Sequence, residues 1–272
     1  PNNSQAFAYR AYSLNSLGKY EEGLQSAERS LDIEPGNTVA LNNKGTALHA
    51  LGRPGEALDS FNESVRLNPT NAVAWTNKGY VLASMGRYEE ALEAYNISLE
   101  LNPRQANIWG YQASALVAVS RFDEAVLAAE KELELNPQNF RALTAKGEAL
   151  TNLKKYDEAA AIFREASKLN PSSVTTWLNL GYVLFATKDY EDANDAFQHA
   201  LEIKPDDSQA WRYKVSSLIA LGRGGEAVRY YDGELSEDPN NTVALMNKGY
   251  ALHQMKQYQD AITIFDKVIG LE

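Results

Sequence analysis

The chain has 272 residues, of which 44% are hydrophobic and 23% are charged, and its formal net charge is −10. This acidity, without any cluster of Lys and Arg, argues against nucleic acid or an anionic membrane surface as the partner. Cysteine is absent, which excludes disulfides and thiolate chemistry. No apolar run approaches the roughly 20 residues of a membrane-spanning helix, so we expect a cytoplasmic protein.

Proline recurs at one fixed interval along the chain. The positions are Pro35, Pro69, Pro103, Pro137, Pro171, Pro205 and Pro239, each 34 residues after the last, and Pro1 lies one interval upstream. The whole length is eight such intervals. A period of this size indicates an internal structural repeat.

Residues 72–105 show what one interval contains. Trp75, Gly79 and Leu82 are four and three residues apart, so they share one face of a first helix. Gly86 can end that helix, because glycine adopts left-handed backbone angles without a steric cost. A second helix is predicted from the apolar stripe of Ala91, Leu92, Tyr95 and Leu99, and it stops before Pro103.

Eight such helix pairs follow one another. They are expected to begin at Ser4, Thr38, Ala72, Ala106, Phe140, Val174, Ser208 and Thr242. The residues just before these starts are Asn3, Asn37, Asn71, Gln105, Asn139, Ser173, Asp207 and Asn241. Asn, Ser and Asp are favoured N-caps, so a capped first helix is predicted in every repeat except the fourth.

This helix–turn–helix period of 34 residues resembles the tetratricopeptide repeat family along the whole chain. The runs NKG and EEAL are similar to arrays of archaeal and bacterial type. The resemblance implies an all-α fold, a right-handed α-solenoid of eight repeats that forms a single domain over residues 1–272. Each repeat would then bury its apolar face against its neighbours.

In this family the eighth and twentieth places of each repeat are small, so that the two helices can touch. Counting from each repeat start, the chain follows this pattern except at Val215, the eighth place of the seventh repeat. We therefore expect the two helices there to stand apart. The segment from about Arg212 to Asp238 is predicted to be the most irregular or mobile part of the chain.

A longer period of 102 residues lies above the first. Repeats three and six share a tryptophan and the run GYVL, and repeats one, four and seven share a tyrosine at the sixth place. The array is therefore interpreted as a three-repeat block in tandem, excised from a longer array. Its last helix carries an apolar stripe that we expect to be uncovered and available for end-to-end self-association: Ala261, Ile264, Phe265, Val268 and Ile269.

No catalytic or metal-binding pattern is present in the sequence. The histidines, His49, His199 and His253, are too far apart to share a metal and are interpreted as surface residues. Neither a phosphate-binding loop nor any other cofactor motif occurs. We therefore expect no enzyme activity, no metal and no cofactor.

The resemblance implies that the first helices line an inner groove, at places 2, 5, 6, 9, 12 and 13 of each repeat. Only Arg141, Glu148 and Arg212 are charged among these places. An amide can both donate to and accept from a peptide group, and tyrosine adds apolar area with a polar tip. The predicted peptide-binding residues are Asn43, Asn77, Asn179, Asn247, Tyr9, Tyr12, Tyr80, Tyr111, Tyr182, Tyr213, Tyr250, Arg141 and Arg212.

The sequence thus favours a protein-interaction scaffold that binds an extended peptide of a protein partner. Two alternatives stay open at this point. The chain could be the regulatory or substrate-selecting arm of a larger enzyme or signalling protein, or it could be a structural solenoid that assembles with itself.

Overall fold

The computed structural model describes residues 3–105 and 107–271, and these contain sixteen α-helices and no strand. The predicted all-α fold of eight helix pairs is confirmed. The pairs are α1 (Ser4–Ser16) and α2 (Tyr20–Ile33), α3 (Thr38–Ala50) and α4 (Pro54–Leu67), α5 (Ala72–Ser84) and α6 (Tyr88–Leu101), α7 (Ile108–Ala118) and α8 (Phe122–Leu135), α9 (Phe140–Asn152) and α10 (Tyr156–Leu169), α11 (Val174–Ala186) and α12 (Tyr190–Ile203), α13 (Ser208–Ala220) and α14 (Gly224–Glu237), and α15 (Thr242–Gln254) and α16 (Tyr258–Ile269).

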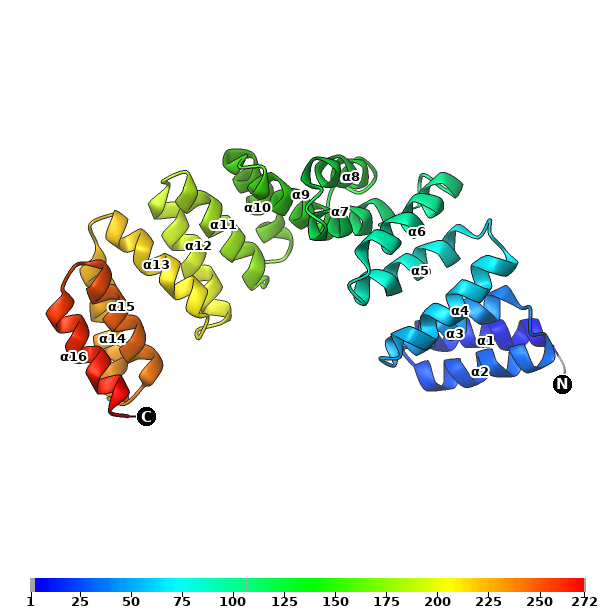
Figure 1. Ribbon diagram of the computed structural model, residues 1–272, viewed down its shortest axis with the longest axis horizontal. Helices are drawn as coiled ribbons and strands as arrows, with labels where there is room; N and C mark the ends of the chain where they lie inside the picture. Colours follow the sequence, from blue (N-terminus) through cyan, green and yellow to red (C-terminus); the bar gives the residue numbers. More distant parts are fainter. Residues whose placement is uncertain (1–2, 106, 272) are drawn as a thin grey trace. The chain divides into compact units, whose positions relative to one another are not determined.

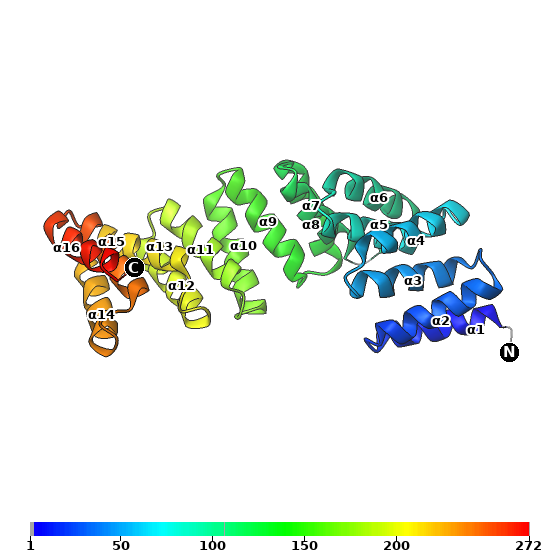
Figure 2. The same ribbon diagram turned by 60° about the horizontal axis from the view of Figure 1, so that its bottom comes forward.

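The helices form two compact units, residues 1–145 and residues 146–272, and the boundary falls within α9. The single solenoid over residues 1–272 therefore stays a prediction. Inside each unit the two helices of a pair lie side by side (Figure 1). The first helix of the next pair is also contacted by α2, α4, α6, α10, α12 and α14. The first helices contact one another as well, through α1, α3, α5 and α7 in one unit and α11, α13 and α15 in the other (Figure 2). The first helices of a unit thus form a continuous layer.

The N-cap prediction is confirmed in detail. In seven repeats the side chain of the predicted cap accepts a hydrogen bond from a backbone N–H of the first turn. Gln105, the expected exception, does not cap; its amide donates to Thr76 Oγ1 instead, at 2.8 Å. Seven of the eight expected helix starts are also correct, while Ala106 lies outside the described residues.

A buried carboxylate replaces the missing cap of α7. The helix starts at Ile108, after Asn107 with a φ of 70°. Glu132 on α8 is fully buried, and its carboxylate accepts from the N–H groups of Asn107 and Gly110 at 3.2 and 3.3 Å and from the Asn139 amide at 2.8 Å. Its negative charge therefore sits at the positive end of the helix dipole.

The eighth place of a repeat is small for a reason that the sequence did not reveal. In five repeats it is glycine, and a Cβ added there would lie 2.5–2.7 Å from an aromatic ring at place 24. These contacts are Gly45 with Phe61, Gly79 with Tyr95, Gly147 with Phe163, Gly181 with Phe197 and Gly249 with Phe265. Where the eighth place is alanine, at Ala11 and Ala113, place 24 is alanine too. The expectation of small against small thus described only part of the contact, since the ring is the main partner.

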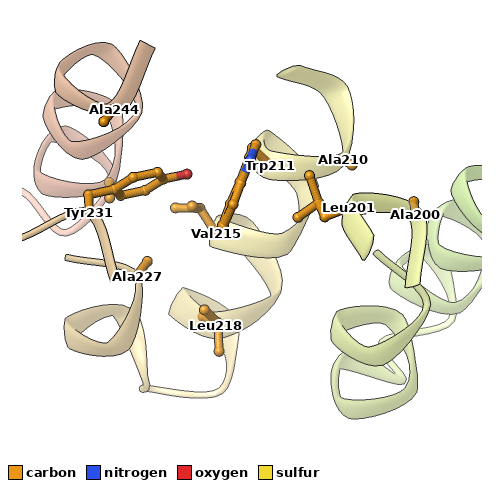
Figure 3. Packing of buried hydrophobic residues seen from close by; sticks show 10 residues of the cluster. Ala200, Leu201, Ala210, Trp211, Val215, Leu218, Ala227, Tyr231 and Ala244 are labelled. Atoms are coloured by element: carbon orange, nitrogen blue, oxygen red, sulfur yellow. The ribbon is translucent and has the colours of Figure 1, made fainter. Parts of the chain in front are cut away.

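The seventh repeat breaks this pairing, because Val215 faces an aromatic residue. Figure 3 shows Val215 and the Tyr231 ring together between α13 and α14, and both are about 1% exposed. These two helices pack less closely than the pairs α1–α2, α3–α4, α5–α6, α7–α8, α11–α12 and α15–α16. The predicted separation is therefore present. Both helices are nevertheless unbroken, and the least regular helix start is that of α7, so the irregularity here is one of packing and not of the helical backbone. Mobility of residues 212–238 stays a prediction.

Two recurrent polar contacts, hydrogen bonds or ion pairs, join successive repeats. Each tryptophan indole donates to the carbonyl of the proline six residues earlier, at 2.8–3.1 Å in all four cases. In addition, the residue at the seventh place reaches back sixteen residues to the preceding second helix. These pairs are Lys44 with Glu28, Gln112 with Asn96, Lys214 with Gln198, and Lys248 with Asp232.

The last helix is better covered than expected. Ala261 and Val268 are buried, Ile264 and Phe265 are partly buried, and Ile269 alone of the predicted stripe is largely exposed, at 71%. The other helix of the same repeat, α15, therefore covers most of the stripe. Self-association through this helix stays a prediction.

The turn inside every repeat has one residue with a left-handed backbone. It is Gly18, Gly52, Gly86 and Gly222 in four repeats, and Ser120, Lys154, Lys188 and Lys256 in the others. Only glycine adopts this conformation without a steric cost, so four repeats carry strain that the other four avoid.

Replacing Lys188 by glycine should therefore raise the free energy of unfolding by about 1 kcal/mol. Urea denaturation followed by circular dichroism measures this. Lys155→Gly is the matched control, since Lys155 has a φ of −86°. An equal gain in both variants would contradict the explanation.

Loss of the buried carboxylate in Glu132→Ala should lower the free energy of unfolding by about 3 kcal/mol, because three polar groups around it lose their partner. The same denaturation experiment applies. Glu134→Ala removes an exposed carboxylate of the same helix, and we expect it to have little effect.

Candidate peptide-binding groove

The first-helix layer presents most of the predicted groove residues to solvent. Tyr9, Tyr12, Tyr80 and Tyr182 are exposed, as are Arg141 and Arg212, while Tyr111, Tyr213 and Tyr250 are half-buried. The asparagines Asn77, Asn179 and Asn247 are also half-buried. Amides and phenols therefore gather on the face where the resemblance placed them.

Asn43 is more deeply buried than the other asparagines of this set. It is only 7% exposed, and its amide donates to the Ala8 carbonyl at 2.9 Å. The Asn15 amide donates in turn to the Asn43 carbonyl at 2.8 Å. These bonds join α1 to α3 and give Asn43 a structural role. Asn43 also lines a cavity with Tyr12 and Asn42, and its contact with a peptide stays a prediction.

Three cavities follow one another along this face in the N-terminal unit. The first, of about 450 Å³, lies over α1, α3 and α5 and includes Tyr12 and Asn42. The second, of about 250 Å³, shares Thr46 and Asn77 with the first. The third, of about 330 Å³, shares Tyr80 and Tyr111 with the second. Neighbouring cavities thus have common walls and make one groove.

A cluster of rings forms the wall between the second and third cavities. Tyr80 meets Tyr111 edge to face, with ring centroids 5.4 Å apart, and Tyr95 stacks on Tyr111 at 6.2 Å. The Arg141 guanidinium lies over the Tyr111 ring, 4.8 Å from its centroid. Ring and guanidinium faces of this kind attract each other, which holds the arginine beside the groove.

His49 is a groove residue that the sequence interpretation missed. Its ring meets Tyr80 edge to face at 5.2 Å, and its Nε2 lies 3.0 Å from Ser84 Oγ. Partial burial lowers the pKa of the imidazole, so the neutral form is favoured near neutral pH. The signal was its position at place 12, which is itself one of the groove places.

The C-terminal unit repeats the aromatic arrangement. Tyr182 meets Tyr213 edge to face at 5.9 Å, and Phe197 stacks on Tyr213 at 5.3 Å. Tyr213 also lines a cavity of about 420 Å³ together with Arg212 and Tyr250. A tyrosine-walled hollow is therefore present in each unit.

Glu148 puts a partly buried carboxyl on the same face. Burial raises its pKa, while a hydrogen bond donated by Asn179 at 3.5 Å acts in the opposite direction. The Asn179 amide is thus partly engaged inside the protein. Within residues 3–105 and 107–271, no side-chain hydrogen bond is formed by Asn77 or Asn247.

Two features are absent from the described part of the chain. No group of three or more His, Cys, Asp or Glu residues there could hold a metal ion. Among the same residues, no helix is long and apolar enough to cross a membrane.

Comparison with protein families decides the classification. Residues 15–218 match the family described as the cilia and flagella-associated protein 70 C-terminal domain, a tetratricopeptide type, and residues 214–271 match the family described as the tetratricopeptide repeat. The chain belongs to the tetratricopeptide repeat family. No protein of curated function matches it.

Solved structures of other tetratricopeptide repeat proteins are similar to this one. PilF from Pseudomonas aeruginosa aligns with a TM-score of 0.69 and 16% identity, over 78% of this chain and 97% of its own. A tetratricopeptide repeat protein from Parabacteroides merdae gives 0.63 and 18%, over 92% and 98%. YrrB, described as having an unusual peptide-binding site, gives 0.60 and 20%, over 69% and 97%. At these identities the likeness is one of fold.

The raised pKa of Glu148 predicts a pH dependence of stability. As pH rises from below 4.5, the unfolded chain loses this proton before the folded chain does, so the wild type loses stability relative to Glu148→Gln. We expect the difference in free energy of unfolding to grow between pH 4 and pH 7, measured by urea denaturation at several pH values. A difference that stays constant with pH would contradict the assignment.

Proposed function

We propose that this tetratricopeptide array is a non-catalytic scaffold that binds an extended segment of a partner protein along the first-helix face. The observation that carries the proposal is the continuous groove of the N-terminal unit, where the amide of Asn77 and the phenols of Tyr80 and Tyr111 line successive cavities.

The chemistry of the groove supports a peptide ligand. An extended chain offers alternating N–H and C=O groups, and a side-chain amide can satisfy either kind. Tyrosine rings add rigid apolar surface at a small entropy cost and carry a hydroxyl at the tip. Few charges lie among the groove places although the chain carries a net charge of −10, so backbone and apolar contacts should dominate.

The family adds support of a general kind. YrrB shares the fold and is described by its peptide-binding site. The ligand of the present chain is argued from its own groove residues, because a likeness at 20% identity carries the fold alone.

Selection from a displayed library of random 12-residue peptides against the whole chain tests the proposal. For an enriched peptide, Asn77→Ala should weaken binding about 2- to 10-fold, since a lost hydrogen bond contributes about 0.5–1.5 kcal/mol. Fluorescence anisotropy with the labelled peptide measures the affinity.

Asn62→Ala is the matched control, because Asn62 is exposed on the second helix of its repeat and should leave affinity unchanged. Unchanged binding in Asn77→Ala, or failure of the library to yield any peptide, would overturn the proposed function.

A further inference from the structure

We propose that the third cavity of the N-terminal unit accepts a carboxylate side chain, Asp or Glu, of the bound segment. This inference rests on the proposed function and adds a chemical requirement to it. The cavity lies between α5, α6, α7 and the first turn of α9, and the argument depends on two of its residues, Tyr95 and Arg141.

Tyr95 carries a hydroxyl that the packing of the repeat does not require. Its ring fills the space opposite Gly79, and the same place holds Phe61, Phe163 and Phe197 in other repeats. The residue is 0% exposed, its hydroxyl has no hydrogen-bond partner within the described residues, and it lines the cavity. A polar atom buried without a partner lowers stability, and a bound acceptor in the cavity would supply the missing partner.

The protonation state of that hydroxyl decides what it can bind. Burial raises the pKa of the Tyr95 phenol above its ordinary value, with Tyr111 acting in the same direction and the Arg141 charge against it. The phenol therefore stays protonated and can donate a hydrogen bond. Tyr95 and Arg141 also line the same cavity, so a group bound there lies near both.

Arg141 supplies the second donor. It is exposed at the cavity edge over the Tyr111 ring, and it forms no ion pair with any carboxylate of the described residues. No other groove place of the N-terminal unit is charged. A guanidinium and a phenol are both donors here, and a carboxylate is the acceptor-only side chain that can satisfy both.

The chain contains its own comparison for this cavity, 102 residues further on. Tyr182 and Tyr213 repeat the aromatic walls of Tyr80 and Tyr111. Phe197 stands in place of Tyr95, and the exposed Val243 stands in place of Arg141. The C-terminal copy thus keeps the two tyrosine walls but lacks the phenol and the guanidinium that would donate to a carboxylate. We therefore expect only the N-terminal copy to bind one.

The test uses a library of C-terminally amidated random 12-residue peptides, selected in parallel against the wild type and Arg141→Met. Every acidic group in these peptides is then a side chain. The wild type should enrich one position in Asp or Glu, and Arg141→Met should lose that preference while still enriching aromatic or apolar residues.

An enriched peptide and its Glu→Gln counterpart then quantify the contact by fluorescence anisotropy. Arg141→Met should lower affinity for the Glu peptide about 10-fold and leave the Gln peptide unchanged. Tyr95→Phe should lower affinity for the Glu peptide about 5-fold without loss of stability, because phenylalanine occupies this place elsewhere. Tyr231→Phe is the control, since its hydroxyl is also buried without a partner but lies in the apolar cluster of Figure 3.

The outcomes separate the two proposals. Groove-dependent peptides without an acidic position, or an equal loss for the Glu and Gln peptides, would overturn this inference and leave the scaffold intact. Binding that requires a free C-terminal carboxylate in place of the side chain would overturn it as well. Absence of any groove-dependent peptide would overturn both.

Discussion

The close contact between a backbone and a ring organises each repeat. Where the eighth place is glycine, the aromatic side chain of the second helix lies directly on the first helix, with no room for a single added carbon. Interiors are packed as densely as organic crystals, so such a contact fixes the spacing of the two helices. It also fixes which face of the first helix turns away from its partner. The groove residues lie on that face, and their presentation therefore depends on a contact that no ligand touches.

Within a unit, the groove arises because first helices contact first helices while second helices reach forward to the next pair. Neither helix of a pair can bury its apolar side alone, so each repeat needs its neighbours. The exposed amides and tyrosines share one layer for this reason. Their chemistry is mostly uncharged, and the few ionic groups there, Arg141 and Glu148 among them, mark positions where one part of the groove differs from another.

Sequence patterns predicted the repeat boundaries well because they depend on local chemistry. Proline and the Asn, Ser or Asp caps act within a few residues, and the structure has the caps as expected. Contacts between repeats were harder to predict. Asn43 shares its residue type and place with Asn77, yet it is buried against α1 because Ala8 and Asn15 lie beside it. The role of Glu132 could not be predicted, since it depends on the irregular start of α7.

The sequence contains Tyr95 as part of an apolar helical stripe, and this pattern indicates a core residue and not a binding residue. Place 24 is phenylalanine in several other repeats, so a tyrosine there is interpreted as one more core residue, and its ring does pack in the core. The position of the hydroxyl beside Arg141 depends on α5, α6, α7 and α9 together, which a one-dimensional pattern does not contain. Comparison with the copy 102 residues away, Phe197 and Val243, makes the difference visible.

The polar contact between the seventh place of one repeat and the residue sixteen positions earlier, in the preceding repeat, bears on how such a chain could evolve. In each described pair the residue at the seventh place is the donor, Lys or Gln. The residue on the preceding second helix, Glu, Asn, Gln or Asp, supplies the oxygen. Each of these donors can pair with each of these acceptors, so recombination that duplicates, deletes or reorders the repeats that carry them would preserve the contact, while the sixth repeat, with Leu180 at this place, lacks the donor. Shuffling of repeats could then produce new combinations of groove residues without changes in the contacts between repeats.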